Sequence, residues 1–105
     1  MIDEFVFPKS LHEGQRYNVL CTVIKGDAPL EIQWLKDGLP LPANNNLKST
    51  SGHLKGVTVS QVTEFSAMLN FASLLSEHRG NYTCKATNIA GSASYTVKME
   101  IQGTL

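Results

Sequence analysis

The sequence carries no excess of charge of either sign, and this absence excludes several classes of protein. Nine Lys and Arg side chains balance nine Asp and Glu side chains, so the formal net charge is zero. A nucleic-acid-binding protein needs a basic face and a polybasic membrane anchor needs a basic cluster, so we expect neither function. A chain without net charge also meets little electrostatic resistance to self-association.

Long apolar runs are missing too. No stretch approaches the roughly 20 apolar residues that a helix needs to cross a bilayer. Residues 1–4 lack the basic and apolar regions of a signal peptide, and we interpret Met1 as an added start residue. The targeting and membrane segments of a secreted or anchored parent protein are therefore expected outside this chain.

Residue patterns for catalysis and metal binding are scarce. His12, His53 and His78 are isolated, with no Cys or other His at ligand spacing, whereas structural zinc takes four ligands. We interpret His78 as a surface residue. No Gly-x-Ser-x-Gly elbow, phosphate loop or paired carboxylates occur. We expect no enzyme activity: no catalytic residue, no metal, no cofactor and no small-molecule substrate.

What the sequence does contain is a succession of β-strand signals. Runs rich in Val, Ile, Thr, Tyr and Phe alternate with turn clusters, and no window keeps helical spacing for three turns. The expected strands are residues 4–7, 16–24, 30–35, 57–60, 65–71, 82–88 and 93–101, with a short edge strand and a long surface loop within residues 39–56. The dipeptide Asp37-Gly38 predicts a tight hairpin, because Gly tolerates positive φ. These strands indicate one all-β sandwich domain over residues 1–105, with its ordered core at about residues 3–102.

Two cysteines and one tryptophan fall at inward positions of these strands. Trp34 lies thirteen residues after Cys21, and Tyr82 precedes Cys84 by two. In a sandwich, a bridge between opposite sheets crosses the core and an indole packs against it. We predict a Cys21–Cys84 disulfide, which stabilises by about 4 kcal/mol in the chain-entropy model. Two free, buried cysteines remain the alternative.

Three motifs extend this pattern. Residues 78–84 resemble the Asp-x-Gly-x-Tyr-x-Cys corner of the immunoglobulin superfamily, I-set type, with His78 in place of the usual Asp. Residues 88–91 resemble its Asn-x-Ala-Gly turn, and residues 69–74 resemble its Leu-x-Ile-x-x-Leu run. The resemblance implies an immunoglobulin-like Greek-key sandwich with A-B-E-D and C-F-G sheets, and a core signature of Trp34, Tyr82 and Leu69. It also puts the family's ion pair from that Asp to an Arg in question.

A narrower resemblance concerns four segments. Residues 4–8, 14–16, 22–34 and 36–38 are similar to variable immunoglobulin domains of the Dscam family, in particular the seventh domain of arthropod members and the first domain of shortened ones. The resemblance implies a cell-surface adhesion module that pairs with an identical copy on an opposing cell. This pairing is antiparallel, isoform-specific and made through the A-B-E-D sheet. It implies an extracellular location in a membrane-anchored parent protein.

The outward positions of the expected A-B-E-D sheet are therefore candidate interface residues. They are Arg16, Asn18, Leu20, Thr22, Ser66, Met68 and Asn70. Leu20, Met68 and the neighbouring Ile24 are apolar side chains expected to face solvent, which favours a partner-binding patch. Scattered exposed apolar side chains are also normal on a monomer. The competing functions are heterophilic ligand or pathogen recognition through the irregular residues 44–55, and a structural spacer without an interface.

Asn81-Tyr82-Thr83 is an N-glycosylation sequon. Asn81 precedes the inward-facing Tyr82, so its side chain is expected to point outward and to be open to modification. The tripeptide also arises whenever the corner motif happens to contain Asn and Thr. Both interpretations stay open on the sequence alone.

Overall fold

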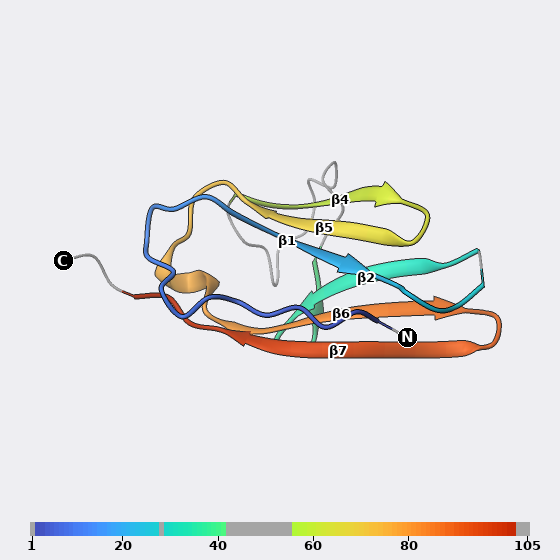
Figure 1. Ribbon diagram of the computed structural model, residues 1–105. Helices are drawn as coiled ribbons and strands as arrows, with labels where there is room; N and C mark the ends of the chain where they lie inside the picture. The colour runs from blue at the N-terminus through green and yellow to red at the C-terminus, as the bar shows by residue number, and fades with distance from the viewer. Residues whose placement is uncertain (1, 28, 42–55, 103–105) are drawn as a thin grey trace.

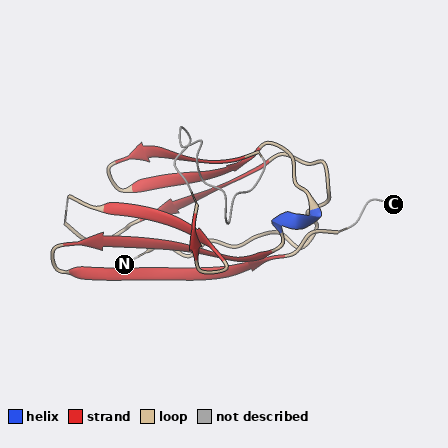
Figure 2. Cartoon of the chain, turned by 180° about the vertical axis from the view of Figure 1, so that it is seen from behind, coloured by secondary structure: helices blue, strands red, loops and turns tan. Residues whose placement is uncertain are grey.

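Two antiparallel β-sheets face each other across one core. The computed structural model describes residues 2–27, 29–41 and 56–102 (Figure 1). One sheet has the order β1-β5-β4 and the other the order β3-β2-β6-β7. The strands are β1 (Tyr17–Thr22), β2 (Glu31–Lys36), β3 (Leu39–Pro40), β4 (Val57–Thr63), β5 (Ser66–Phe71), β6 (Gly80–Asn88) and β7 (Gly91–Met99). A short 3-10 helix, η1 (Ser76–His78), joins β5 to β6 at one end of the sandwich (Figure 2).

Alternation of side chains explains why these segments form half-buried strands. In β1, Val19 and Cys21 are buried while Asn18 and Leu20 are exposed. Successive side chains of a strand point to opposite faces, so one parity fills the core and the other meets solvent. The all-β fold and its two antiparallel sheets confirm the sequence prediction.

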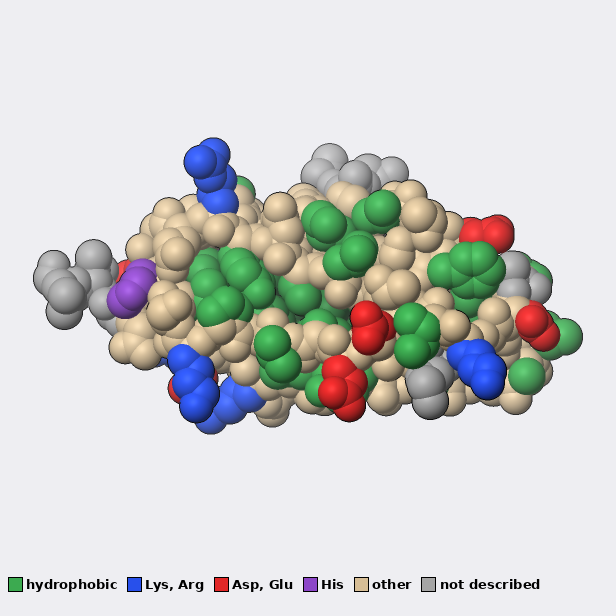
Figure 3. Space-filling model, in the orientation of Figure 1, with side chains coloured by type: hydrophobic (Ala, Val, Ile, Leu, Met, Phe, Trp, Pro, Cys, Tyr) green, Lys and Arg blue, Asp and Glu red, His purple; other side chains and the backbone are tan. Residues whose placement is uncertain are grey.

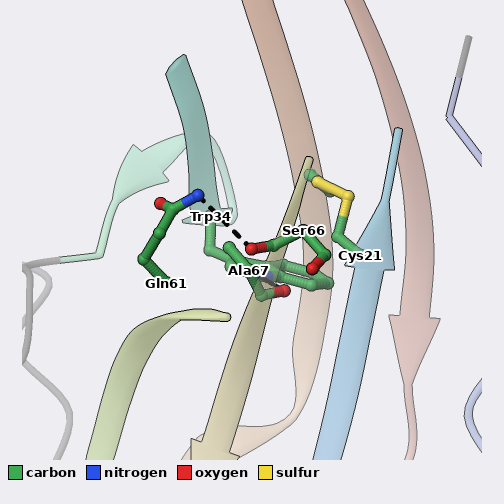
Figure 4. The surroundings of a disulfide bond; sticks show 6 residues. Cys21, Trp34, Gln61, Ser66 and Ala67 are labelled. Carbon is green, nitrogen blue, oxygen red and sulfur yellow. Dashed lines mark hydrogen bonds between the residues drawn. A yellow bond between two sulfur atoms is a disulfide. The ribbon is translucent and has the colours of Figure 1, made fainter. Parts of the chain in front are cut away.

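The disulfide prediction is also confirmed, because Cys21 of β1 and Cys84 of β6 are bonded across the two sheets. Trp34 is the register partner of Cys84 and is fully buried. Its indole Nε1 donates a hydrogen bond to the Ala67 carbonyl on β5, 3.3 Å away. Figure 4 shows the indole reaching from β2 toward Ala67, near the disulfide. These contacts fasten one sheet to the other at the centre of the core.

The predicted strand at residues 4–7 is wrong. Phe5 and Phe7 are buried, but residues 4–7 are in no strand, and the nearest backbone pairing is an isolated bridge from Ile2 to Val23. The aromatic rings explain the burial: Phe5 lies edge-on to Trp34, with ring centroids 5.1 Å apart, and Phe7 contacts Tyr82. The segment is therefore held by side-chain packing rather than by a ladder of hydrogen bonds.

The predicted turns are formed. Asp37 and Gly38 both have positive φ, 51° and 86°, and connect β2 to β3 as a tight hairpin. At the β6–β7 turn the Asn88 side-chain oxygen accepts hydrogen bonds from the backbone N–H groups of Ala90 and Gly91. The predicted long loop lies mostly outside the described residues, as does His53. Among the described residues, no helix is long and apolar enough to cross a membrane.

Candidate interaction surface

The three-stranded sheet carries no charged residue in any of its strands. β1, β4 and β5 consist only of apolar, hydroxyl and amide side chains. The opposite sheet differs, because it contains Glu31, Lys36, Lys85 and Lys98. The outer face of β1-β5-β4 is therefore the one sheet face of the described fold that can be covered without burying a strand charge.

Leu20, Met68 and Ser60 form the middle row of that outer face. Leu20 lies opposite Met68 in the β1–β5 register, and Ser60 lies opposite Met68 on β4. Leu20 is 41% exposed and Met68 is half-buried. The prediction that these two side chains leave the core is confirmed. Figure 3 shows a group of apolar side chains over β1 and β5 with uncharged atoms around it.

Two further apolar side chains are exposed toward one end of this sheet. Ile24, just beyond β1, is 56% exposed, and Val62, near the end of β4, is 51% exposed. The exposure of Ile24 matches the sequence prediction. Val62 was missed, because the expected strand ended at residue 60, whereas β4 continues to Thr63.

Three polar side chains of this face already bond to one another. Asn70 Nδ2 donates a hydrogen bond to Ser60 Oγ at 3.0 Å and a longer one to Thr58 Oγ1 at 3.4 Å. These three side chains join β5 to β4 on the outer face. Because the Asn70 amide already donates to partners within the sheet, covering it with a second surface leaves it with hydrogen-bond partners.

The predicted exposure of Ser66 is wrong. Its parity is outward, yet only 5% of the residue is exposed. The β4–β5 hairpin folds over it: Ser66 Oγ lies 2.8 Å from Thr63 Oγ1, and Gln61 Nε2 donates to the Ser66 carbonyl (Figure 4). Ser66 therefore supports the hairpin and is not available as a contact residue. Of the other candidates, Arg16 and Asn18 are exposed and Thr22 is half-buried.

The surface interpretation of His78 is also wrong, because this residue is fully buried at the end of the sandwich. Its Nδ1 accepts a hydrogen bond from the Leu75 backbone N–H at 2.8 Å, and its ring lies edge-on to Phe71. The Arg79 guanidinium donates to the Ile101 carbonyl through both Nε and Nη2, at 3.1 and 2.8 Å. The neutral His78 imidazole thus caps the Leu75 N–H. Arg79 bonds to a backbone carbonyl, where the family usually has an ion pair between an Asp and an Arg.

Asn81 is exposed on the outer face of the four-stranded sheet, beside the β2–β3 hairpin. Its backbone N–H donates to Asp37 Oδ1 at 2.9 Å, and its carbonyl accepts from the Asp37 N–H at 2.8 Å. The Lys36 ammonium, 2.8 Å from Asp37 Oδ2, holds the pKa of that carboxyl below its usual value, and the Asn81 N–H lowers it further.

No described residues gather into a group of three or more His, Cys, Asp and Glu side chains that could hold a metal ion.

The comparisons with known proteins agree with the architecture. The family model described as immunoglobulin domain matches residues 4–88, and the chain belongs to that family. Within it, this is a Dscam-like immunoglobulin domain. The cell adhesion molecule Dscam2 of Drosophila melanogaster is 38% identical over 101 residues, which cover 96% of this chain and 4% of that protein. The cell adhesion molecule DSCAM of Rattus norvegicus is 35% identical over 101 residues, with the same coverage of 96% and 4%.

A solved structure of the Dscam1 Ig7 domain, isoform 5, superposes with a TM-score of 0.84 at 28% identity, over 97% of this chain and 95% of that one. This chain thus spans about 4% of the length of the two curated relatives and nearly all of a single solved domain.

Proposed function

We propose that the chain is a homophilic adhesion domain, which pairs with an identical copy on an opposing cell through the outer face of β1-β5-β4. One observation carries the proposal: this face has an apolar centre, Leu20 with Met68, and no charged residue in its strands. An apolar centre with an uncharged polar surround is the composition of a partner-binding patch.

Absence of charge matters more for a self-pairing surface than for any other. A two-fold contact is isologous, so the same patch is used on both copies. A charge near the axis would meet its own copy, and like charges brought together at an interface cost several kcal/mol. The Arg16 side chain, exposed just before β1, lies at the end of the face, where solvent screens it.

The relatives of the domain and its disulfide support an extracellular role. The curated relatives are named cell adhesion molecules. The Cys21–Cys84 disulfide is of a kind that persists in oxidising compartments. We accordingly place the domain in the ectodomain of a membrane-anchored protein, where differences in the outer-face residues between isoforms would restrict pairing to identical copies.

Sedimentation of the isolated chain over a range of concentrations tests the proposal. One face of this size offers about 800 Å² per partner, so we expect weak dimers that gain strength through many molecules. Leu20→Asp should abolish self-association and leave the melting temperature close to that of the wild type. Gln33→Glu, a charge added to the exposed face of the opposite sheet, should leave dimers intact. A dimer that survives Leu20→Asp, or a wild type that stays monomeric at every concentration, would reject this face.

A further inference from the structure

We propose that Asn81 carries an N-linked glycan, which covers the outer face of the four-stranded sheet and leaves β1-β5-β4 as the bare sheet face. The inference rests on the proposed function only in requiring passage through the secretory route. Asn81 begins an Asn-Tyr-Thr sequon, is exposed, and lies opposite Lys98 in the β6–β7 register. Lys98 is itself well exposed, with 68% of its side chain accessible. A hydrophilic chain attached here enters water and displaces no packed side chain.

The position of Tyr82 fixes the direction of the modified side chain. Tyr82 is fully buried between the sheets, so its neighbour Asn81 points to the outside. The two sheets pack face to face about 10 Å apart, so the outer faces look in opposite directions. A glycan on Asn81 therefore blocks a partner from the four-stranded sheet, and its attachment point lies on the opposite side of the domain from Leu20 and Met68.

The transfer itself needs both the Asn81 amide and the Thr83 hydroxyl. The Asn81 side-chain nitrogen forms a bond to the anomeric carbon of a lipid-pyrophosphate-linked oligosaccharide, the lipid pyrophosphate leaves with the bonding electron pair, and the nitrogen loses one proton. In the folded domain the Thr83 hydroxyl lies 2.8 Å from the Thr96 hydroxyl. Asn81 is held by two backbone hydrogen bonds with Asp37.

These contacts place the transfer before folding. β6 is paired with β2 on one edge and with β7 on the other, so the folded sequon cannot enter a transferase site as a free segment. We therefore infer that the nascent chain is the substrate and that the finished sandwich is not. Afterwards the glycan projects outward, and both Asp37 hydrogen bonds use only the Asn81 backbone, which the modification leaves unchanged.

Translation of the chain behind a signal sequence, in the presence of endoplasmic-reticulum microsomes, tests the site without requiring the product to fold. Wild type and Thr83→Ser, which keeps the hydroxyl, should both gain the mass of one glycan, removable by an amide-cleaving glycosidase. Asn81→Gln and Thr83→Ala should gain none. Ala90→Thr adds a second sequon at Asn88 in the exposed β6–β7 turn and should give a second shift. An unmodified wild type beside an Ala90→Thr chain modified once overturns the proposal.

A separate experiment tests whether glycan transfer precedes folding. Unglycosylated domain, folded and oxidised, should stay unmodified when offered to the transferase with the lipid-linked oligosaccharide, while the reduced and unfolded chain should be modified. Equal modification of both would overturn the claim that pairing of β6 closes the site. A Thr96→Val variant, which removes the partner hydroxyl of Thr83, should leave the folded domain unmodified, because β6 stays paired.

The proposed glycosylation site and the proposed pairing face can be rejected independently of each other. Glycosylated domain and the same sample after glycosidase treatment should show the same dissociation constant for the dimer in sedimentation equilibrium. If neither sample self-associates although the untreated one carries the glycan, the homophilic function is rejected and the glycosylation site stands. Self-association that appears only after the glycan is removed would show that the glycan blocks the pairing surface, and would overturn the proposal that it leaves the pairing face bare.

Discussion

The Tyr82 hydroxyl donates a hydrogen bond to the backbone carbonyl of His78, four residues earlier, and both residues are fully buried. The bond closes the turn between η1 and β6, at the end of the sandwich where the His78 ring also caps the Leu75 N–H. Tyr82 thus links the core, through its ring, to the backbone of a turn that has no strand partner of its own.

Removal of that single hydroxyl should be costly. Tyr82→Phe leaves the buried His78 carbonyl without its donor, and we expect a loss of about 1–3 kcal/mol in the free energy of unfolding. Urea unfolding at neutral pH measures it. Tyr95→Phe is a suitable control, because Tyr95 is only half-buried and its change should be smaller. Equal losses in the two variants would argue against a special role for the Tyr82 hydroxyl.

The same tyrosine should make the domain sensitive to alkali. Burial, helped by the nearby Asp37 carboxylate, raises the pKa of Tyr82 well above the ordinary value of 10.0. The unfolded chain therefore releases this proton first, so the contribution of Tyr82 to stability is complete below about pH 10 and is lost as the pH rises toward the folded-state value. Burial also raises the pKa of Tyr17 above 10.0, in the same direction.

Unfolding titrations between pH 8 and 12 check this dependence. Stability should fall above pH 10, by up to about 1.4 kcal/mol per pH unit for each tyrosine. The fall should be shallower in Tyr82→Phe, which has no proton to release at that position. A wild type and a Tyr82→Phe variant with parallel pH profiles would contradict the assignment to Tyr82.

Loss of the disulfide should remove a large part of the stability. Cys21 and Cys84 are separated by 63 residues, and the chain-entropy model gives about 4 kcal/mol for a loop of that length. The double variant Cys21→Ala, Cys84→Ala should lose about that much in guanidinium unfolding. A thiol titration of the unfolded wild type should find no free thiol. Two reactive thiols would restore the alternative of free, buried cysteines and the intracellular spacer function.

Gly80 and Gly91 form a matched pair for a test of backbone strain against contact. Both have a φ of +148°, but a Cβ at Gly80 would lie 2.8 Å from each carboxylate oxygen of Asp37, whereas Gly91 has open space. Gly91→Ala should lose about 1–3 kcal/mol from the strained φ alone. Gly80→Ala should lose more, because it also displaces Asp37 from the Asn81 N–H.

A double-mutant cycle separates the two causes. In an Asp37→Ala background the carboxylate contact is gone and the Lys36 ammonium, 3.0 Å from the same Cβ, loses its anchor, so the added cost of Gly80→Ala should fall toward that of Gly91→Ala. Thermal unfolding of the four proteins measures the coupling. An unchanged cost of Gly80→Ala in both backgrounds would show that the Asp37 carboxylate plays no part.

The alternation of side chains made most of this fold predictable, and its failures have identifiable causes. Val19 and Cys21 are inward because half-buried antiparallel strands show polarity at a period of two. Phe5 and Phe7 show the same period, yet their segment is no strand, since ring packing buries them without backbone pairing. A sequence displays the period of burial and not the hydrogen-bond partner.

Part of the candidate surface was also predictable from the alternation of side chains. Leu20 and Met68 follow from parity alone, and the absence of charge from β1, β4 and β5 could have been read from the sequence once the strands were paired. Ser66 could not, because its cover comes from a hairpin bulge at Gln61 and Thr63. The burial of His78 could not either, since it depends on the path of η1 beneath Phe71.

Met68 lies at the centre of the outer face, both across the strands and along them. It lies on β5, the middle strand of the sheet, and in the middle of the three outward rows. Two antiparallel copies overlap most when the two-fold axis passes near this point, so each Met68 should meet the Met68 of the other copy. This arrangement makes a prediction that no off-centre contact shares.

Variants with opposite charges at position 68 should dimerise with each other, and neither variant should dimerise with a second copy of itself. Met68→Glu and Met68→Lys should each be monomeric in sedimentation, because like charges would meet at the axis, and an equimolar mixture should form dimers of one copy of each. Circular dichroism and melting temperatures should show both variants folded, since Met68 is half-buried on the outer face and does not fill the core. The same pair of charges at Gln33, on the opposite sheet, should leave wild-type dimerisation unchanged. If the mixture stays monomeric while wild type dimerises, the axis does not pass near Met68.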